Sequence, residues 1–165
     1  MELNTQIPTT PPRDAATVVM LRDTAQGLEV FLVKRHGLSD VMGGAYVFPG
    51  GKLDASDTQL DSAQYLDQPP ALLHATLGEP AIDMPTAMGL YVAALREAFE
   101  ESRVLFAQRA PGASSVQTAV SHGAIPFNQL LAERSLRLQT RLVLPWSRWI
   151  RREAPPVPPN SPVAA

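Results

Sequence analysis

The sequence contains no cysteine in its 165 residues. Disulfide bonds, thiolate metal sites and cysteine nucleophiles are therefore excluded, and any metal ion must be held by carboxylate, imidazole or carbonyl groups. Acidic and basic side chains number 16 and 14, so the formal net charge is only −2. This near balance lacks the basic character of chains that bind nucleic acid or anionic membranes, and we expect neither as a partner.

Long apolar runs are also absent, since no stretch reaches the length of about 18 apolar residues that marks a membrane-spanning helix. Residues 1–5 lack the basic and apolar regions of a signal peptide. We therefore expect a cytoplasmic protein. A chain of 17.8 kDa with 45% hydrophobic residues suits one domain with its own core.

Proline marks the ends of that domain. Eight of the 16 prolines lie in residues 1–14 and 151–165. We expect a disordered tail in the first segment and a proline-rich tail without core-forming capacity in the second. The domain predicted between them covers residues 15–150.

Two β-branched stretches, residues 15–22 and 28–35, predict strands that form an antiparallel hairpin around a longer loop at 23–27. The first of these strands is expected to be buried. A short strand at 45–48 should stop at Pro49-Gly50-Gly51, because proline cannot donate to a β-ladder and glycine permits unusual backbone conformations. Backbone at such a point can approach a phosphate or a metal, although a plain tight turn is as common.

Residues 58–85 contain several prolines and predict an inserted excursion with one short helix at 70–77. His74 falls in that helix and is expected to be a surface or packing histidine rather than a metal ligand. Three further elements are predicted downstream: a short strand at 104–107, a helix at 126–134 and a partly buried apolar strand at 142–150.

A longer helix is predicted to begin near Pro85, since proline suits the first helical turn. Beside its apolar face, Glu97 lies one helical turn from both Glu100 and Glu101. Like charges at these spacings mildly destabilise a helix. Two interpretations are therefore open: a solvated acidic face, or a site for a divalent cation that takes oxygen ligands. The residues that recur at helical spacing and should form a core-facing stripe are Met88, Val92, Leu95, Phe99 and Ser102.

The segments Phe48-Pro49-Gly50-Gly51 and Arg96-Glu97-Ala98-Phe99-Glu100-Glu101 together resemble the signature of the Nudix hydrolases. That signature runs glycine, five residues, glutamate, seven residues, arginine–glutamate, an aliphatic residue, any residue, a glutamate pair, any residue, glycine and an aliphatic residue. The resemblance covers residues 15–107. Gly51 corresponds to the first glycine, Asp57 to the first glutamate, Arg96 and Glu97 to the arginine–glutamate pair, Glu100 and Glu101 to the glutamate pair, and Val104 to the last aliphatic residue.

The spacing differs from the signature, because Gly51 and Arg96 are 45 positions apart, 31 more than the signature has. A long insert at this point resembles a subgroup that includes acyl-coenzyme A diphosphatases and their bacterial relatives. Members of that subgroup usually continue with further strands, so the C-terminal part of this sequence is expected to be shortened. Arg103 replaces the second glycine. Either it adopts the left-handed conformation of a helix-ending glycine, at a cost of about 1 kcal/mol, or the helix runs one residue further.

The resemblance implies an α+β fold, in which helices sandwich a mixed β-sheet and the 58–85 insert separates the Gly-Gly loop from the catalytic helix. It also implies Mg²⁺ or Mn²⁺ as the cofactor. Asp57 would either add a metal ligand or position the loop, and Arg96 would orient a carboxylate rather than touch the substrate. The implied site residues are Glu97, Glu100 and Arg96 for catalysis, Glu97, Glu100, Glu101 and Asp57 for the metal, and Gly50 and Gly51 for backbone groups near the metal.

The implied activity is hydrolysis of the diphosphate linkage in a nucleoside-diphosphate-X substrate, with coenzyme A or an acyl-coenzyme A favoured by the subgroup. Two alternatives are open. One is a catalytically impaired Nudix-like module that binds a nucleotide or a partner without turnover, and the other is a shortened inactive fragment. The expected partner is a small nucleotide-type substrate, and the oligomeric state, monomer or homodimer, is not fixed by the sequence.

Overall fold

The computed structural model describes residues 12–37, 43–109 and 125–149. Contacts divide the chain into a compact unit, Asp14–Pro145, and a second unit made of the two end segments. Both predicted tails, residues 1–14 and 151–165, lie almost entirely outside the described residues.

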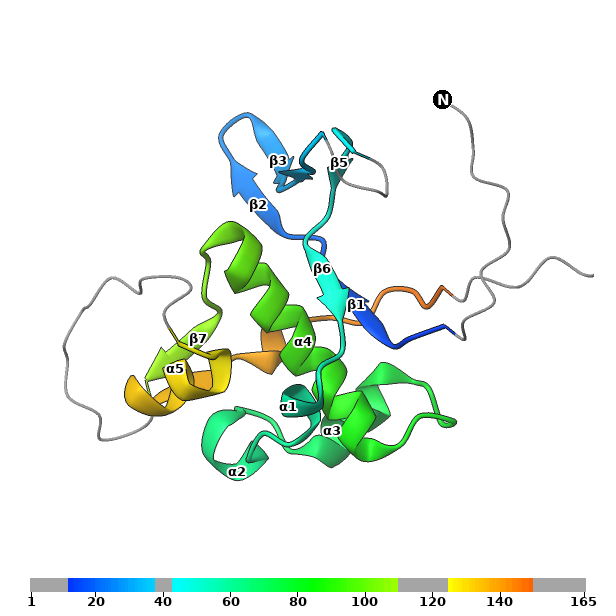
Figure 1. Cartoon of the computed structure of the whole chain (residues 1–165), viewed down its shortest axis with the longest axis vertical. Coiled ribbons are helices and arrows are strands. Elements are labelled where there is room, and N and C mark those ends of the chain that lie inside the picture. Colours follow the sequence, from blue (N-terminus) through cyan, green and yellow to red (C-terminus); the bar gives the residue numbers. More distant parts are fainter. Residues whose placement is uncertain (1–11, 38–42, 110–124, 150–165) are drawn as a thin grey trace, which may run out of the picture. The chain divides into compact units, whose positions relative to one another are not determined.

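The strands are β1 (Ala15–Thr17), β2 (Leu21–Thr24), β3 (Gly27–Val30), β4 (Val33–Lys34), β5 (Tyr46–Val47), β6 (Gly50–Lys52), β7 (Ala107–Arg109) and β8 (Leu136–Leu138) (Figure 1). The helices are α1 (Ala55–Thr58), α2 (Ser62–Tyr65), α3 (Pro70–Leu77), α4 (Met84–Ser102), α5 (Phe127–Glu133) and the 3₁₀ helix η1 (Thr140–Leu142).

Helix α4 is the central element of the compact unit and confirms the long helix predicted near Pro85. It begins at an N-cap, Asp83, whose side chain accepts a hydrogen bond from the Thr86 N–H at 2.7 Å. The predicted apolar stripe is buried except for Ser102, which is only half-buried and donates to the Ala98 carbonyl. The core cluster consists of Leu60, Leu66, Leu73, Met88, Tyr91, Val92, Leu95, Phe99, Phe127, Leu130, Leu131 and Leu138.

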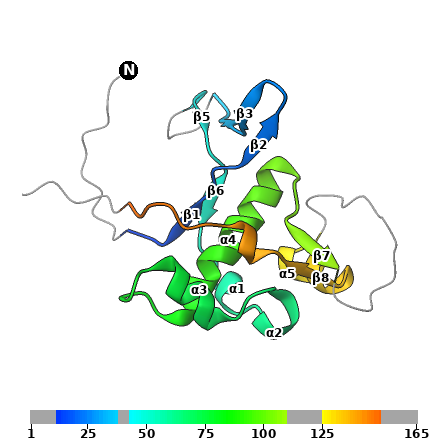
Figure 2. The same cartoon turned by 180° about the vertical axis from the view of Figure 1, so that it is seen from behind.

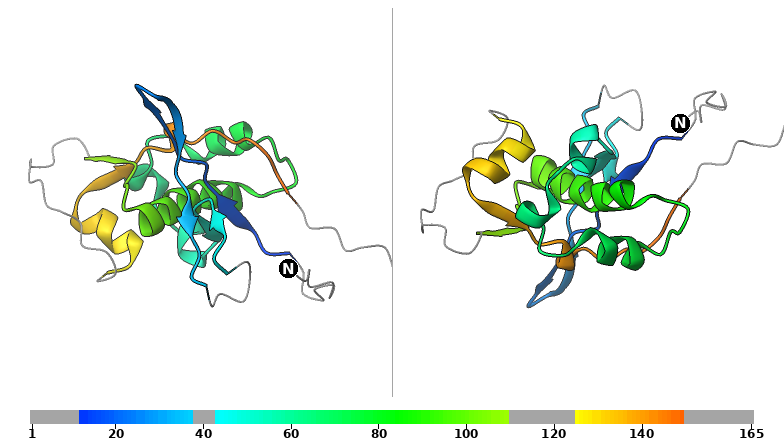
Figure 3. Two further views of the ribbon diagram at one scale, coloured as in Figure 1. Left: turned by 90° about the horizontal axis from the view of Figure 1, so that it is seen from above. Right: turned by 90° about the horizontal axis from the view of Figure 1, so that it is seen from below.

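Residues 58–85 wrap α4 rather than forming a separate body. Helices α1 and α3 both contact α4, while α2 contacts β8, and Figures 2 and 3 show these helices around one end of α4. The predicted helix at 70–77 is confirmed by α3. Leu66 and Leu73 are each only 1% exposed, so this region supplies part of the core. The Nε2–H of His74 donates a hydrogen bond to the Ile82 carbonyl at 2.7 Å, as a packing histidine would.

The described strands form four two-stranded antiparallel sheets, not the mixed sheet that was expected. The pairs are β1–β6, β2–β3, β4–β5 and β7–β8, with one isolated parallel bridge between Leu66 and Leu138. The reason is the shortness of the strands. Each has two to four residues, and breaks at residues 18–20, 31–32 and 48–49 shift the pairing from one neighbour to another.

Several strand boundaries differ from the prediction. The segment 15–22 is not one strand, because its first part pairs with β6 and its last part with β3. The antiparallel hairpin itself is confirmed, but its turn is only Ala25-Gln26, with Gly27 at φ 120°. The expected burial is wrong as well, since Leu21 is 57% exposed.

Downstream of α4, one prediction is confirmed and two are incorrect. The helix at 126–134 is confirmed by α5, whereas the strand expected at 104–107 lies three residues later, as β7. The partly buried strand expected at 142–150 is wrong within its described part. Trp146 and Trp149 are 97% and 90% exposed, and no described strand pairs with this segment, in which Pro145 has no N–H to donate.

Within the described ranges, no helix combines the length and the apolar character needed to cross a membrane.

Candidate active site

The site is built where strand β6 runs along helix α4. Strand β6 is held by β1, whose Ala16 lies opposite Gly51 in an antiparallel register. The predicted short strand is present as β5 and ends at Val47, before Pro49, but a new strand, β6, begins at once at Gly50. The Pro49 carbonyl accepts a hydrogen bond from the Val18 N–H at 2.8 Å. The Gly-Gly pair therefore lies inside a strand and not in a loop.

Each glycine of β6 leaves room for a different neighbour. A Cβ on Gly50 would lie 2.6 Å from the Ala16 carbonyl oxygen, so backbone of β1 occupies that space. A Cβ on Gly51 would lie 2.2 Å from Oε1 of Glu97. The missing side chain of Gly51 thus allows the Glu97 carboxylate to lie directly against the strand.

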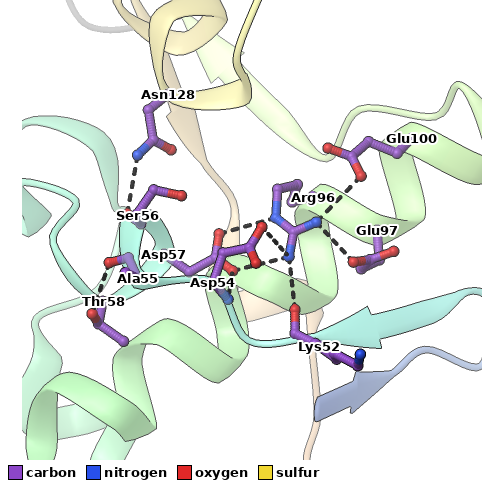
Figure 4. Close-up of polar contacts among 10 residues, drawn as sticks. All are labelled: Lys52, Asp54, Ala55, Ser56, Asp57, Thr58, Arg96, Glu97, Glu100 and Asn128. Atoms are coloured by element: carbon purple, nitrogen blue, oxygen red, sulfur yellow. Dashed lines mark hydrogen bonds and ion pairs between the residues drawn. The ribbon is translucent and has the colours of Figure 1, made fainter. Parts of the chain in front are cut away.

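Arg96 connects the strand, the following loop and the acidic face of α4 (Figure 4). Its Nε and Nη2 donate to the two carboxylate oxygens of Asp57, each at 3.0 Å, and Nη2 also donates to the Lys52 carbonyl at 3.0 Å. Its Nη1 donates to Oε1 of Glu97 at 2.7 Å and to Oε2 of Glu100 at 3.2 Å. Such charge-assisted forks fix geometry as well as supplying energy, so Arg96 orients three of the four predicted ligands, Asp57, Glu97 and Glu100.

Asp57 is fully buried, and its position follows from a local turn. The Asp57 N–H donates to the Asp54 carbonyl, and the Asp54 N–H donates to Oδ2 of Asp57 at 2.9 Å, which closes the first turn of α1. Both Asp57 oxygens also accept from Arg96. Of the two roles that the sequence left open for Asp57, metal ligand or loop positioning, this geometry favours loop positioning. A metal ion at Asp57 would compete with the two hydrogen bonds from Arg96.

The pKa of Arg96 reflects this enclosure. Burial acts to lower it, but the hydrogen bonds to Asp57 and the charge of Asp57, followed by those of Glu97, raise it above the ordinary arginine value. The guanidinium therefore stays charged at any physiological pH. Arg96 is a permanent cation that forms ion pairs with four carboxylates, those of Asp54, Asp57, Glu97 and Glu100. It therefore lowers the cost of placing these acids together.

Glu101 lies at the same edge but is not bonded to Arg96. Burial raises its pKa above the ordinary value, a hydrogen bond from the Gly50 N–H opposes this, and the charges of Glu97 and Glu100 raise it further. Arg35 lowers it by a smaller amount. The charges of Glu97 and Glu100 therefore act unfavourably on the Glu101 carboxylate, which is an electrostatic condition that favours cation binding.

The donor set fits a hard divalent cation, because Mg²⁺ and Mn²⁺ take carboxylate and carbonyl oxygens. Because Gly51 has no side chain, the Glu97 carboxylate has room beside the strand. In the described part of the chain, however, no three acidic or histidine side chains converge as they stand into a group that could hold a metal ion. Arg96 binds one oxygen each of Glu97 and Glu100, so metal binding requires these side chains to turn from Arg96 or to use their other oxygens.

Sequence reasoning missed two contributors, the Lys52 carbonyl and Arg35. The Lys52 carbonyl is a backbone group, for which side-chain identity carries no signal, although it adjoins the Gly-Gly pair. Arg35 lies at the end of β4, and its approach to Glu101 depends on tertiary packing. No pattern in the sequence marks it.

The end of α4 resolves the two alternatives for Arg103. The helix ends at Ser102, and Arg103 takes the left-handed conformation with φ 66° and ψ 11°, while its N–H donates to the Phe99 carbonyl at 2.9 Å. The strained alternative is therefore the one the chain adopts, and the helix does not run further.

Comparison with known proteins identifies a structural relative. No protein-family model matches the chain. The crystal structure of a NUDIX hydrolase from Alicyclobacillus acidocaldarius is similar, with a TM-score of 0.55 and 25% sequence identity over 81% of this chain. The chain covers 59% of the length of that structure. With its helix-and-strand composition and the contact of β6 with α4, the compact unit therefore has a Nudix-like fold of the α+β class.

Proposed function

We propose that the chain is a metal-dependent hydrolase of the diphosphate linkage in a nucleoside-diphosphate-X substrate, acting in the cytoplasm. Coenzyme A or an acyl-coenzyme A is the favoured substrate, on the basis of the subgroup that the sequence resembles. The observation that carries the proposal is the network in which Arg96 joins Asp57 and the Lys52 carbonyl to Glu97 and Glu100. The similarity to a NUDIX hydrolase supports a pyrophosphohydrolase type of reaction.

Glu97, Glu100 and Glu101 would hold the Mg²⁺ or Mn²⁺ ion. Such an ion neutralises charge on phosphoryl oxygens and lowers the pKa of a bound water. Arg96 takes Oε1 of Glu97 and Oε2 of Glu100, which leaves the second oxygen of each carboxylate as a ligand. Glu97 also lies against Gly51 of β6 and would accept the proton of the attacking water if it is not a ligand.

Arg96 and Asp57 act as positioning residues in this proposal. The Arg96 side chain is 8% exposed and that of Asp57 is fully buried, so neither is accessible to a substrate. Their role is to hold Glu97 and Glu100 at a fixed distance from the strand. A fixed constellation is what phosphoryl transfer needs, because positioning and charge stabilisation supply most of its rate acceleration.

A second function is favoured by one observation. The three glutamates do not converge as a metal group in the described structure, and a site that never closes around a metal would bind a nucleotide without cleaving it. A non-catalytic nucleotide-binding module is therefore the rival of the hydrolase. The two differ in turnover, not in binding.

The deciding experiment incubates the purified protein with Mg²⁺ or Mn²⁺ and a panel of coenzyme A, NADH, ADP-ribose and nucleoside triphosphates. Adenosine 3′,5′-bisphosphate should be released from coenzyme A. Glu100→Gln should abolish release, whereas Glu133→Gln, an exposed acid on α5 that contacts Gln129, should leave it unchanged. Binding of panel members by a well-folded protein that cleaves none of them would favour the rival module and refute the hydrolase.

The metal is tested separately by thermal melting. An ion that binds only the folded state must raise the melting temperature. We expect Mn²⁺ to raise it for the wild type and for Glu133→Gln but not for Glu100→Gln. A rise of equal size in all three proteins would place the ion elsewhere.

A further inference from the structure

Helix α1, which carries Asp57, has only four residues, Ala55–Thr58. The last four carbonyls of any helix have no partner within it, so every carbonyl of α1 needs a donor from outside the helix. One such donor comes from a distant element. Nδ2 of Asn128, in α5, donates to the Ser56 carbonyl at 3.0 Å across 72 positions of sequence (Figure 4).

Helix α5 is itself fixed against α4 by the residue that precedes Asn128. Phe127 is buried, and the centroid of its ring lies 6.2 Å from that of Phe99 on α4. Leu130 and Leu131 of α5 also belong to the core cluster. Asn128 therefore projects from an element whose position relative to α4 is set by apolar packing, and its amide connects that element to α1.

Helix α1 also contacts α4 directly. A Cβ on Gly89 of α4 would lie 2.7 Å from Cγ2 of Thr58 and 3.3 Å from its Cα, so this glycine lets α1 approach α4 closely. At the preceding residue of α1, Asp57 accepts the two hydrogen bonds from Arg96. Three successive residues of α1 are thus held by α5, by the Arg96 fork and by close packing on α4.

The amide of Asn128 is satisfied at one end only. Its Oδ1 is buried and has no hydrogen-bond partner in the described part of the chain, whereas its Nδ2 bonds to Ser56. A buried acceptor without a donor is unfavourable, and buried polar groups are ordinarily paired. A leucine would fill a similar volume without this cost, so packing alone does not account for an asparagine. What asparagine provides is the donor to α1.

We propose, on the basis of the hydrolase function proposed above, that Asn128 is a positioning residue for the metal site. By fixing the Ser56 carbonyl, it holds Asp57 where both carboxylate oxygens accept from Arg96. The remaining nitrogen of Arg96 then keeps the two glutamates of α4 in place. Replacement of residues that orient metal ligands from outside costs about 10–100-fold in metal affinity or activity.

Asn128→Asp tests the role of the donor, because it keeps the shape of the side chain but replaces Nδ2 by an oxygen that the Ser56 carbonyl repels. We expect it to bind Mn²⁺ at least about tenfold more weakly than the wild type, as followed by the melting temperature over a Mn²⁺ titration. At Mn²⁺ concentrations well below the wild-type Kd, kcat should fall by a similar factor while KM for the substrate is unchanged.

The matched control is Gln129→Glu, the same change of amide to carboxylate at the next residue, whose Nε2 donates to Glu133 within α5. It should bind Mn²⁺ like the wild type. Asn128→Leu separates positioning from stability, since it removes both the donor and the unpartnered oxygen. Without metal it should melt close to the wild type, yet it should show the same loss of Mn²⁺ affinity as Asn128→Asp.

Failure of this role is distinguishable from failure of the hydrolase. If the wild type binds Mn²⁺, wild-type affinity in both Asn128 variants overturns the positioning role, whether or not any substrate is cleaved. If the wild type neither binds Mn²⁺ nor cleaves a substrate, the hydrolase is refuted and the role is tested by coupling without metal. Asn128→Asp should then lower the melting temperature less in the Arg96→Met/Asp57→Leu background than in the wild type. An equal lowering in both would overturn the positioning role.

Discussion

Arg96 and Asp57 are 39 positions apart in the sequence, yet two nitrogens of Arg96 donate to the two carboxylate oxygens of Asp57 at 3.0 Å. The pair joins the start of α1 to the middle of α4. It is buried on both sides, with side-chain exposures of 8% and 0%. A buried ion pair of this kind tolerates the loss of both partners far better than the loss of one.

Arg96→Met should therefore destabilise the protein by about 3–5 kcal/mol, because it leaves the Asp57 carboxylate buried without a counter-charge. The double variant Arg96→Met/Asp57→Leu should regain most of that loss. Equilibrium urea unfolding of the wild type and the two variants measures both differences. A double variant as unstable as Arg96→Met alone would contradict this account of the pair.

The two glycines of β6 should respond differently to alanine. Gly50→Ala places a Cβ against backbone of β1, 2.6 Å from the Ala16 oxygen and 2.9 Å from the Thr17 Cα. Because backbone cannot move aside, we expect a loss of at least about 1–3 kcal/mol. The three atoms nearest to a Cβ on Gly51 all belong to the Glu97 carboxylate, which can rotate away.

The free energy of unfolding of Gly51→Ala should thus lie within about 1 kcal/mol of the wild-type value. The variant should nevertheless lose the Mn²⁺-dependent rise in melting temperature and most of the hydrolysis. Thermal melts of both variants with and without Mn²⁺ make the comparison. If Gly51→Ala kept its response to Mn²⁺, the carboxylate of Glu97 would not be needed where the structure places it.

The sequence predicts the helices of this chain better than its strands. Helix α4 could be predicted because an apolar stripe at helical spacing, a proline near the first turn and 19 residues of length agree with one another. Strands of two to four residues give almost no periodic signal. Pairing of β1 with β6 and of β7 with β8 depends on contacts between distant segments, which no local pattern carries.

The candidate site also combines features that the sequence predicts with features that it does not. The acids of α4 and the Gly-Gly pair could be found from residue types and spacing. The burial of Asp57 could not, since the deciding feature is that the Arg96 side chain reaches back to α1. Residues 142–150 give an example of a wrong prediction of burial. Their apolar and aromatic side chains predicted a partly buried strand, but Trp146 and Trp149 are exposed.

Arg103→Gly should stabilise the protein by about 1 kcal/mol, because glycine adopts the left-handed conformation without the penalty of a Cβ. The matched control is Gly78, which ends α3 at φ 71° and where an added Cβ would meet no other atom within 4 Å. Gly78→Ala should be destabilising by a similar amount. Urea unfolding of both variants gives the change in the free energy of unfolding, which should be positive for Arg103→Gly and negative for Gly78→Ala. Changes of the same sign would show that the backbone conformation does not determine these effects.

The Asp83 cap should make stability depend on acid pH. The hydrogen bonds from Thr86 lower the pKa of Asp83 below its ordinary value, against a smaller effect of burial, and His74 adds to the lowering. A lowered pKa in the folded state means that the stabilisation is complete above the ordinary value, 3.8, and is lost as the pH falls through the folded-state pKa. Asp83→Ala should thus melt below the wild type at neutral pH, and the difference should vanish in acid.

Asp83→Asn is the control for that experiment, because asparagine caps a helix nearly as well but does not titrate. Melting curves of the three proteins between about pH 2 and pH 7 follow the linkage. A gap between the wild type and Asp83→Ala that stays constant down to the lowest pH would show that the carboxylate charge contributes nothing.

Two adjacent leucines of α3 test whether residues 58–85 belong to the core. Leu73 is 1% exposed and lies in the core cluster, whereas Leu72 is 45% exposed. Leu73→Ala removes buried methyl groups and leaves a cavity, so we expect a loss of about 2–5 kcal/mol. Leu72→Ala should change stability by no more than about 0.5 kcal/mol. Both variants make the same change of leucine to alanine in the same helix, so their difference in urea unfolding reports packing alone. If Leu73→Ala were as mild as Leu72→Ala, the packing of α3 would not hold α4 in place.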